Sequence, residues 1–569
     1  MHSSFPPWLR SSWVHGLLLL AVTVAAYSGV TQAGFVFDDH ALVLYNEALH
    51  DIGRAWSFFG QDLWATADGG DASGYYRPLM ALSLAVDWSL AGDSPVLYHL
   101  HSLAWHLLGV WCLHRLLVGL TGPLPALMGA AIFALHPVQS EAVVWIAARN
   151  DLMGAALLLG AVVLLRPLAQ PPWRLALGAL LALGAVLSKE NTLLLPVFLI
   201  VLDLAEHGRP RGWPRHMVLW GAVALHLIAR SVVGVNAAVV PGSEGWWLLA
   251  RQLPVVLALP GGLLAWPWPL SIGRDLVGWS LSPLATAAGL VCGVSLVAGL
   301  LWARRRLVFV GLAWAGMGFA PALLAVADKG VFGERYLYLS MAGLGLALAS
   351  AVDALPAARR RWLGVGLVVV LSWVSVIHTR TQDWKDDVSI WRAAARDTPC
   401  THAYASLGHV QRLDGDPVAS VGSYLLALRG EPSKRQVCPD LLNVVHALGD
   451  IEAVVAASSE AVELGCSDPV TLGKHASYLA MGGRWAQAVE VASALEQDDI
   501  EGRARLVLAA ADMVEGRCSR YRELRADWTG DLDAQMMRLL GHGDHPELAR
   551  ALAEGALCSE SSPAIEAVP

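Results

Sequence analysis

Two adjacent carboxylates, Asp38 and Asp39, follow the first hydrophobic run of the chain, residues 13–33. Neighbouring acids can divide labour: one ionised group accepts a proton while the other orients a partner or holds a cation. An acidic pair at the mouth of a membrane helix bundle is a candidate functional site. Whether these two acids can act as a base therefore depends on the elements that position them.

Composition indicates what those elements are. The 569 residues are 55% hydrophobic and only 15% charged. Apolar runs recur at close to the length of about 20 residues that crosses a bilayer. We therefore predict an all-α integral membrane protein. The first run follows Arg10 and lacks a small-residue cleavage site, which predicts an uncleaved signal-anchor.

Basic residues predict the orientation, because short cytoplasmic loops retain Lys and Arg. The basic positions are Arg10, Arg115, Arg166, Arg174, Arg209, Arg211, Arg215, Arg304–306 and Arg359–361. They all fall on the cytoplasmic side if the spans lie near 13–33, 99–118, 122–138, 152–167, 174–188, 192–206, 217–234, 282–302, 307–327, 336–353 and 362–378. Eleven spans place the N-terminus inside and the C-terminal tail outside. The proline-rich stretch 246–270 favours an interfacial or re-entrant element.

Charge marks a domain boundary near Thr381. From Gln382 onward there are 29 acids and 17 bases, a net charge of −12, and the preceding part has 19 acids and 23 bases, a net charge of +4. The two values sum to the −8 of the whole chain. We predict a membrane domain over 1–380, helical repeats over 381–535, and a capping helix with a disordered end over 536–569.

The predicted topology gathers charged side chains on the non-cytoplasmic face. They are Asp38, Asp39, Arg77, Glu141, Arg149, Asp151, Lys189, Glu190, Glu334 and Arg335, with Arg230 near the outer end of its span. Any one of them could be ordinary loop polarity. Several, however, lie within apolar or aromatic text, as in Tyr75–Leu79 and in the stretch from His136 to Asp151.

Two of these stretches allow a closer interpretation. Ser140 could cap a short helix at the outer interface that carries Glu141 and Arg149 beside the bundle mouth. Lys189 and Glu190 interrupt two apolar runs that are barely long enough to cross, where an unpaired charge costs roughly 2.5–3.5 kcal/mol. A structural Lys189–Glu190 ion pair and a contact with a ligand both remain open.

The order of these motifs carries a family resemblance. FDDHALVLYN, YYRPL, YHLHSLAWH, FALHPVQSEAVVWIAARNDL, LSKEN, LLAWPWPLSIGRDL and ERYLYLS follow one another over nearly the whole chain. This series resembles the transmembrane and tetratricopeptide-repeat-containing O-mannosyltransferases, which are glycosyltransferases of the GT-C class. Ala147–Asp151 departs modestly from the family, which more often has a small-Gly-Arg-Ala-Asp stretch.

The resemblance implies an inverting enzyme. It would move a sugar, mannose in the named family, from a polyprenyl-phosphate donor to an acceptor hydroxyl outside the cytoplasm. Asp38 is the expected base, with Asp39 orienting the acceptor or the base. Arg77, Arg149, Lys189, Arg230 and Arg335 are candidates for the leaving phosphate. We expect His136, Glu141, Asp151, Glu190 and Glu334 to bind sugar hydroxyls or orient those cations. A divalent metal would fit paired acids, but no separate His/Asp cluster demands one.

The tail repeats with the tetratricopeptide period. Gly415, Gly449, Gly482 and Gly516 recur at intervals of 34, 33 and 34 residues. This spacing predicts stacked pairs of antiparallel helices, with the concave face binding acceptor polypeptide or a partner.

Five of the seven cysteines lie in the tail, where an oxidising compartment would allow disulfides. Cys438 with Cys466 is the first expected pair, Cys400 with Cys438 the second, and free structural thiols are the alternative.

A membrane-anchored repeat scaffold without catalysis is the main rival function. A transporter is disfavoured because the spans show no related halves. The expected partners are the lipid-linked donor, a Ser/Thr-containing polypeptide and membrane lipid, but no nucleic acid. The 35 Arg against 5 Lys favour a GC-rich bacterial genome, an inner-membrane location and a periplasmic tail.

Overall fold

A computed structural model of the chain describes residues 11–67, 73–235, 243–275, 287, 291, 306–329, 331–356, 363–430, 437–495, 502–528, 531–554 and 557–558. It divides into two compact units, Met1–Thr398 and Pro399–Pro569. The predicted all-α class is confirmed, because the described strands are only the antiparallel pair β1 (Arg274–Asp275) and β2 (Val331–Phe332). The expected span 282–302 lies outside the described residues, apart from 287 and 291.

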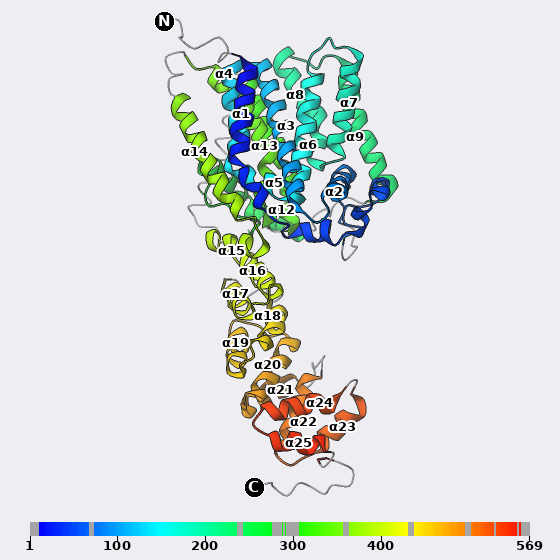
Figure 1. Cartoon of the computed structure of the whole chain (residues 1–569), viewed down its shortest axis with the longest axis vertical. Helices are drawn as coiled ribbons and strands as arrows, with labels where there is room; N and C mark the ends of the chain where they lie inside the picture. Colours follow the sequence, from blue (N-terminus) through cyan, green and yellow to red (C-terminus); the bar gives the residue numbers. More distant parts are fainter. Residues whose placement is uncertain are drawn as a thin grey trace. The chain divides into compact units, whose positions relative to one another are not determined.

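The first unit is a helix bundle (Figure 1). Its helices are α1 (Ser12–Ala26), α2 (Pro78–Ala91), α3 (Pro95–Thr121), α4 (Pro123–Leu135), α5 (Ser140–Val144), α6 (Arg149–Leu165), α7 (Pro172–Val186), α8 (Leu195–His207), α9 (Trp213–Val233), α10 (Ser243–Ala265), α12 (Arg306–Lys329), α13 (Tyr338–Asp353), α14 (Leu363–Gln382) and α15 (Asp387–Asp397). Short 3-10 or π turns cover Ser28–Gln32, His40–Leu44, Glu47–His50, Ile52–Gly60, Pro137–Gln139, Ile146–Ala148, Glu190–Leu194 and Glu334–Leu337.

Several of these helices suit a membrane. Within the described ranges, five stretches are long and apolar enough to cross: Ser12–Gln32, Pro95–Thr121, Ile146–Leu165, Trp213–Val233 and Glu334–Asp353. The bent pair Pro123–Leu135 and Pro137–Val144, with 48° between its parts, would make a sixth. A multi-pass membrane protein is therefore supported, and the full set of eleven spans and its orientation stay predictions. Residues 243–265 form a helix that contains Pro254 and Pro260.

Small residues let the central helices approach closely, as is usual in membrane bundles. A Cβ built on Gly343 of α13 would lie 2.6 Å from the carbonyl oxygen of Gly311 in α12. One built on Gly345 would lie 2.6 Å from the carbonyl oxygen of Gly129 in α4. α13 thus joins α12 to α4 through backbone contact. α6 packs between α3 and α7, and nearly all of its residues are buried.

The described residues of the second unit form short helices and one 3-10 turn. They are α16 (Thr401–Leu413), α17 (Pro417–Gly430), α18 (Val437–Val445), the turn His446–Leu448, α19 (Ile451–Glu463), α20 (Pro469–Met481), α21 (Trp485–Leu495), α22 (Arg503–Val514), α23 (Ser519–Asp527), α24 (Leu532–His542) and α25 (Pro546–Ala553). Successive helices pack on one another, as the repeat predicts. From α20 onward α24 packs back on α20, and Trp485 Nε1 donates to the Gly543 oxygen at 2.9 Å. The later helices thus form a cluster, and a regular tetratricopeptide solenoid remains a prediction.

The glycine period needs one correction. Gly415, Gly449 and Gly516 have φ values of 82°, 76° and 80°, a left-handed conformation that glycine adopts without steric cost. In the third unit Gly483 has this conformation, with φ 71°, whereas Gly482 has φ −85°. The structural interval is therefore 34, 34 and 33 residues.

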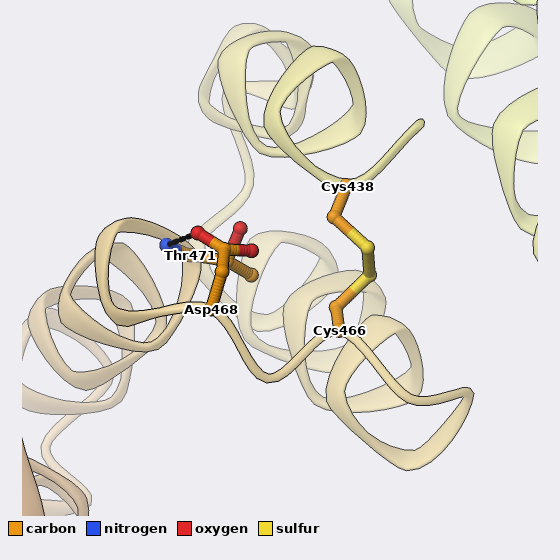
Figure 2. Close-up of a disulfide and its surroundings, with 4 residues drawn as sticks. All are labelled: Cys438, Cys466, Asp468 and Thr471. Atoms are coloured by element: carbon orange, nitrogen blue, oxygen red, sulfur yellow. Dashed lines mark hydrogen bonds between the residues drawn. A yellow bond between two sulfur atoms is a disulfide. The ribbon is translucent and has the colours of Figure 1, made fainter. Parts of the chain in front are cut away.

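Two disulfides close loops in the second unit. Cys438, at the start of α18, is bonded to Cys466, just after α19, and this is the pair expected first (Figure 2). Beside it the Asp468 carboxylate accepts from the Thr471 N–H at 3.0 Å and caps α20. The second bond, Cys518–Cys558, was not predicted. Cys400 is a free thiol.

Candidate active site

The two acids of the first loop have different environments. Asp39 is fully buried, its Oδ1 accepts from the Ala147 N–H at 2.8 Å, and its Oδ2 accepts from the Val36 N–H at 3.1 Å. Burial raises the pKa of Asp39 to about 8, against the lowering effect of these two N–H donors. Both oxygens are occupied by the backbone, so this side chain anchors the loop.

Asp38 is the acid of this pair whose carboxylate can reach a ligand. Its side chain is partly exposed, and no hydrogen-bond partner for it is found in the part of the chain that the structure describes. Burial raises its pKa to about 6, and the positive charge of Arg335 limits the rise. A carboxyl group with this pKa is ionised at neutral pH yet basic enough to accept a proton.

The bond from Ala147 to Asp39 depends on a break in the chain after α5. We expected one short helix from Ser140 through Arg149 at the outer interface, and this was wrong. α5 ends at Val144, Trp145 is extended with ψ 121°, and α6 begins at Arg149. The whole stretch is buried, and the Ser140 hydroxyl donates to the Pro137 oxygen at 2.7 Å without capping α5. The break frees the Ala147 N–H from helical bonding, which makes it available to Asp39.

Arg77 and Lys189 each pair with an acid from another segment. Arg77 holds Glu190 through Nη2 at 2.7 Å and Nε at 3.0 Å, and lies over the Tyr75 ring at 4.2 Å. Lys189 Nζ donates to Asp151 at 2.9 Å and to Asn150 at 2.8 Å. The expected alternative of a mutual Lys189–Glu190 pair is therefore not what forms.

These two pairs also act on each other electrostatically. Burial lowers the pKa of Arg77, but the Glu190 charge and a smaller effect of Asp151 raise it above its ordinary value. Burial lowers the pKa of Lys189 despite Asp151. Burial opposes ionisation of Glu190, yet Arg77 lowers its pKa. These couplings show that Arg77, Lys189 and their acids lie in one charged group.

A third pair links the start of α13 to α5. Arg335 Nη1 contacts Glu141 Oε1, and Glu141 Oε2 accepts from the Glu334 N–H at 2.7 Å. The guanidinium lies 4.7 Å from the Trp145 ring centre and 4.8 Å from that of Tyr336. No partner for Arg335 Nε or Nη2 is found among the described residues, so this cation keeps donors for a ligand.

Arg149 lies within the bundle. Its side chain has no exposed surface, pairs with Asp87 at 2.5 Å, and donates to the Tyr98 oxygen at 2.8 Å and the Ser102 hydroxyl at 3.1 Å. These contacts consume donors that a phosphate would need. Asp87 also contacts His101 at 2.8 Å, which places this network between α2 and α3.

Arg230 and His136 contact backbone oxygens. Arg230 donates to Val235 at 3.1 Å and to Gly74 at 2.9 Å. His136 Nδ1 accepts from the Val138 N–H at 3.3 Å, and its Nε2 lies 3.3 Å from the Leu264 oxygen.

Two residues at the site, Arg274 and Asp387, were not predicted from the sequence. Arg274 pairs with Glu334 at 3.1 Å across the β1–β2 connection. Its signal was present, because it stands inside the LSIGRDL motif. Asp387 of α15 contacts His40 at 2.6 Å, although 347 residues separate them. No local sequence pattern predicts that contact.

No group of three or more His, Cys, Asp or Glu side chains in the described part of the chain could hold a metal ion. A divalent metal at the paired acids stays a prediction.

No family model matches the chain, and no solved structure matches it. Curated relatives do. Protein O-mannosyl-transferase Tmtc1 of Drosophila melanogaster is 33% identical over 181 residues, 30% of this chain and 21% of the relative. Protein O-mannosyl-transferase F38B6.6 of Caenorhabditis elegans is 23% identical over 454 residues, 75% of this chain and 64% of the relative. Protein O-mannosyl-transferase TMTC4 of Homo sapiens is 23% identical over 460 residues, 67% of this chain and 62% of the relative.

These matches span about a fifth of the fly protein and less than two thirds of the other two relatives. The resemblance expected from the ordered motifs is confirmed: the curated homologues of this chain are protein O-mannosyl-transferases of the transmembrane, repeat-containing group.

Proposed function

We propose that the chain is a membrane glycosyltransferase of the GT-C class that transfers mannose from a polyprenyl-phosphate donor to a Ser or Thr hydroxyl of a protein. The observation that carries the proposal is the environment of Asp38: no described residue forms a hydrogen bond with its carboxylate, and the positive charge of the partly exposed Arg335 acts on it.

Asp38 activates the acceptor. A hydroxyl must lose its proton as it attacks the anomeric carbon, and a positioned carboxylate with a pKa of about 6 is ionised at pH 7 and can accept that proton. A single base acting opposite the leaving group gives inversion of configuration. Asp39 serves the same step indirectly, because its two backbone bonds fix the segment that carries Asp38.

The exposed fraction of each cationic side chain indicates which of them can reach the leaving phosphate. Their side-chain exposed fractions are 22% for Arg335, 14% for Lys189 and 11% for Arg77, against none for Arg149. Negative charge grows on the phosphate as the sugar leaves, and fixed cations in a partly desolvated site stabilise that charge. We assign Arg335 as the main ligand of the leaving phosphate, because no described residue accepts a hydrogen bond from its Nε or Nη2. Lys189 and Arg77 are the second and third candidates.

Three acids hold these cations in place before the donor arrives. Glu141, Asp151 and Glu190 each accept from one of them, so the ordering entropy of long side chains is not lost at binding. Glu190 has a side chain that is 21% exposed and is the one of the three that we assign to sugar hydroxyls, because Glu141 and Asp151 are buried. Arg149, by contrast, supports the bundle from within.

The relatives and the tail support the proposed acceptor and the proposed side of the membrane. The relatives are named protein O-mannosyl-transferases, which supports mannose and a protein acceptor. The two disulfides of the second unit fit folding in an oxidising, extracytoplasmic compartment. We assign the second unit to holding the acceptor polypeptide.

A reconstituted transfer assay tests the proposal. The full chain in lipid nanodiscs is given mannosyl phosphoryl polyprenol and Ser/Thr-containing peptides, and hexose addition is measured by mass spectrometry. We expect transfer by the wild type and its loss in Asp38→Asn. Asp93→Asn, at an exposed acid between α2 and α3, is the matched control and keeps full activity. Absence of transfer by the wild type, or equal transfer by the Asp38 variant, would refute the assignment.

A further inference from the structure

α15, the last helix of the first unit, contacts the first loop of the chain. Asp387, its first residue, accepts from the Phe37 N–H through Oδ1 at 2.7 Å. Its Oδ2 contacts His40 Nε2 at 2.6 Å. One carboxylate therefore holds the residues on both sides of Asp38 and Asp39. Just before α15, the Gly34 N–H donates to the Trp384 oxygen at 3.0 Å and adds a backbone contact to the same loop.

The held segment has an unusual backbone conformation. Phe37 has φ 52°, in the left-handed region that bulky residues rarely occupy. A conformation of this kind persists only where surrounding contacts impose it. Here the contacts are the Asp387 bond and two rings, since the Phe37 ring centre lies 5.4 Å from that of Trp391 and 5.9 Å from that of Trp145.

The strained residue directly precedes Asp38. A change of φ at Phe37 rotates everything that follows, so the direction of the Asp38 carboxylate depends on the contacts that hold Phe37. The Asp39 anchor fixes the far side of Asp38 through Val36 and Ala147. The near side depends on Asp387.

The charge on Asp387 matters as well as its position. Its hydrogen bond raises the pKa of His40, against the effect of burial. A carboxylate receiving a main-chain N–H and an imidazole N–H makes charge-assisted bonds, which are stronger than those an amide would make.

We propose that Asp387 is a positioning residue of the transfer reaction: it holds residues 37–40 in the strained conformation that presents Asp38 to the acceptor hydroxyl. This inference rests on the proposed function, because it gives Asp387 an effect on turnover only through Asp38. It also connects Asp387, the first residue of α15, to the loop that carries Asp38, although the chain's net charge groups this segment with the acidic tail.

Asp386 supplies a matched control. It is the neighbouring acid and caps α15, accepting from the Ser389 N–H at 2.7 Å, and no contact between its side chain and the first loop is found among the described residues. Asp386→Asn removes the same charge one position away. An effect of the lost charge at the start of α15 therefore appears in both variants, while loss of the loop contact appears only at Asp387.

Hydrogen exchange of the full chain in nanodiscs measures the contact without reference to catalysis. In Asp387→Ala we expect exchange of the amides in peptides covering 34–46 to accelerate about 10-fold, with peptides from α3 and α6 unchanged. In Asp386→Asn we expect no change in the first loop. Asp387→Asn keeps an oxygen for one of the two donors and lies between these results, so folding of the alanine variant is not essential.

Transfer assays on the same samples test the consequence. We expect Asp387→Ala to lose about 10²-fold in rate, the scale for a misplacement of roughly 1 Å at a reacting group, and Asp386→Asn to keep the wild-type rate. Because Asp387 acts through Asp38, combining the Ala variant with Asp38→Asn should lower the residual rate no further than Asp38→Asn alone.

The outcomes separate the two proposals. An active wild type whose Asp387→Ala form transfers within about twofold of the Asp386 control overturns the positioning role and leaves the proposed function intact. A double variant that loses the product of the two single losses also overturns it. A wild type without transfer defeats the proposed function, and this inference with it, even if the exchange data show the loop released.

Discussion

Substituting the two acids of the first loop by Asn should produce different defects: loss of catalysis at Asp38 and loss of stability at Asp39. Asp38 makes no hydrogen bond with the described protein, so Asp38→Asn leaves the fold intact and removes a base. The loss expected for a general base is about 10²–10⁴-fold in rate, or about 3–5 kcal/mol of transition-state stabilisation. Asp39→Asn instead disturbs structure, because an amide has one acceptor oxygen for the two N–H groups that Asp39 now accepts.

The loss of stability in Asp39→Asn can be estimated from the number of acceptor oxygens. One buried N–H, of Ala147 or Val36, is left without an acceptor, which costs about 1–3 kcal/mol. Thermal unfolding in detergent, read separately from initial transfer rates, distinguishes the two variants. We expect a lower unfolding temperature for Asp39→Asn only, and for Asp38→Asn an unchanged temperature with transfer near background.

The pH dependence adds an independent measurement. The pKa of about 6 at Asp38 predicts that kcat/KM rises with pH and levels off above about pH 7, because the ionised carboxylate is the active form. About one tenth of the group is ionised at pH 5 and about nine tenths at pH 7, so the rate should differ by about 10-fold. A flat profile between these values, or an Asp38→Asn enzyme that retains the acid limb, would refute the reasoning.

Three further predictions concern the surrounding structure. A Cβ on Gly333 would lie 2.9 Å from Arg335 Cζ, so Gly333→Ala should displace the guanidinium and lower transfer by about 10-fold to 10²-fold, as measured by kcat/KM. Arg149→Met removes the cationic partner of the buried Asp87, which keeps its contact with His101, and should lower stability by about 3–5 kcal/mol, seen as a loss of folded protein in size-exclusion chromatography. Cys438→Ser should lower the free energy of unfolding of the second unit by about 2–4 kcal/mol, measured by chemical denaturation without reductant.

Matched controls are present in the chain. Nothing lies within 4 Å of a Cβ built on Gly364, so Gly364→Ala should leave transfer unchanged. Cys400 is a free thiol, so Cys400→Ser should leave the second unit as stable as the wild type. Equal effects of either control and its partner would contradict the contact assigned to that partner.

Much of the architecture was predictable because its causes are local or periodic. A bilayer requires long apolar runs, and these indicated the helical membrane class directly. The repeat spacing predicted the short helices of the tail. It was wrong by one residue at Gly482, because the sequence does not show which of two adjacent glycines takes the left-handed conformation. The pairing of Cys438 with Cys466 followed from antiparallel helices that bring the two ends of a hairpin together.

Contacts between distant segments were not predictable in the same way. Hydropathy identified Lys189 as a costly charge, but its partner Asp151 lies on another helix and could not be chosen over Glu190. Arg149 resembled a phosphate ligand in the sequence and proved to be enclosed, because Asp87 faces it from α2.

The sequence alone determined that an acidic pair follows the first span and that basic and acidic side chains from several loops gather on the same predicted face. Composition and hydropathy did not distinguish Asp38 from Asp39, and the choice of Asp38 as the base was an expectation without a structural reason. Only the tertiary structure separated them: a break after α5 turns the Ala147 N–H toward Asp39, while Asp387 holds the residue before Asp38. Hydrogen bonds between segments are formed by folding and leave no pattern in the order of residues, so the acid left to accept a proton is decided in three dimensions.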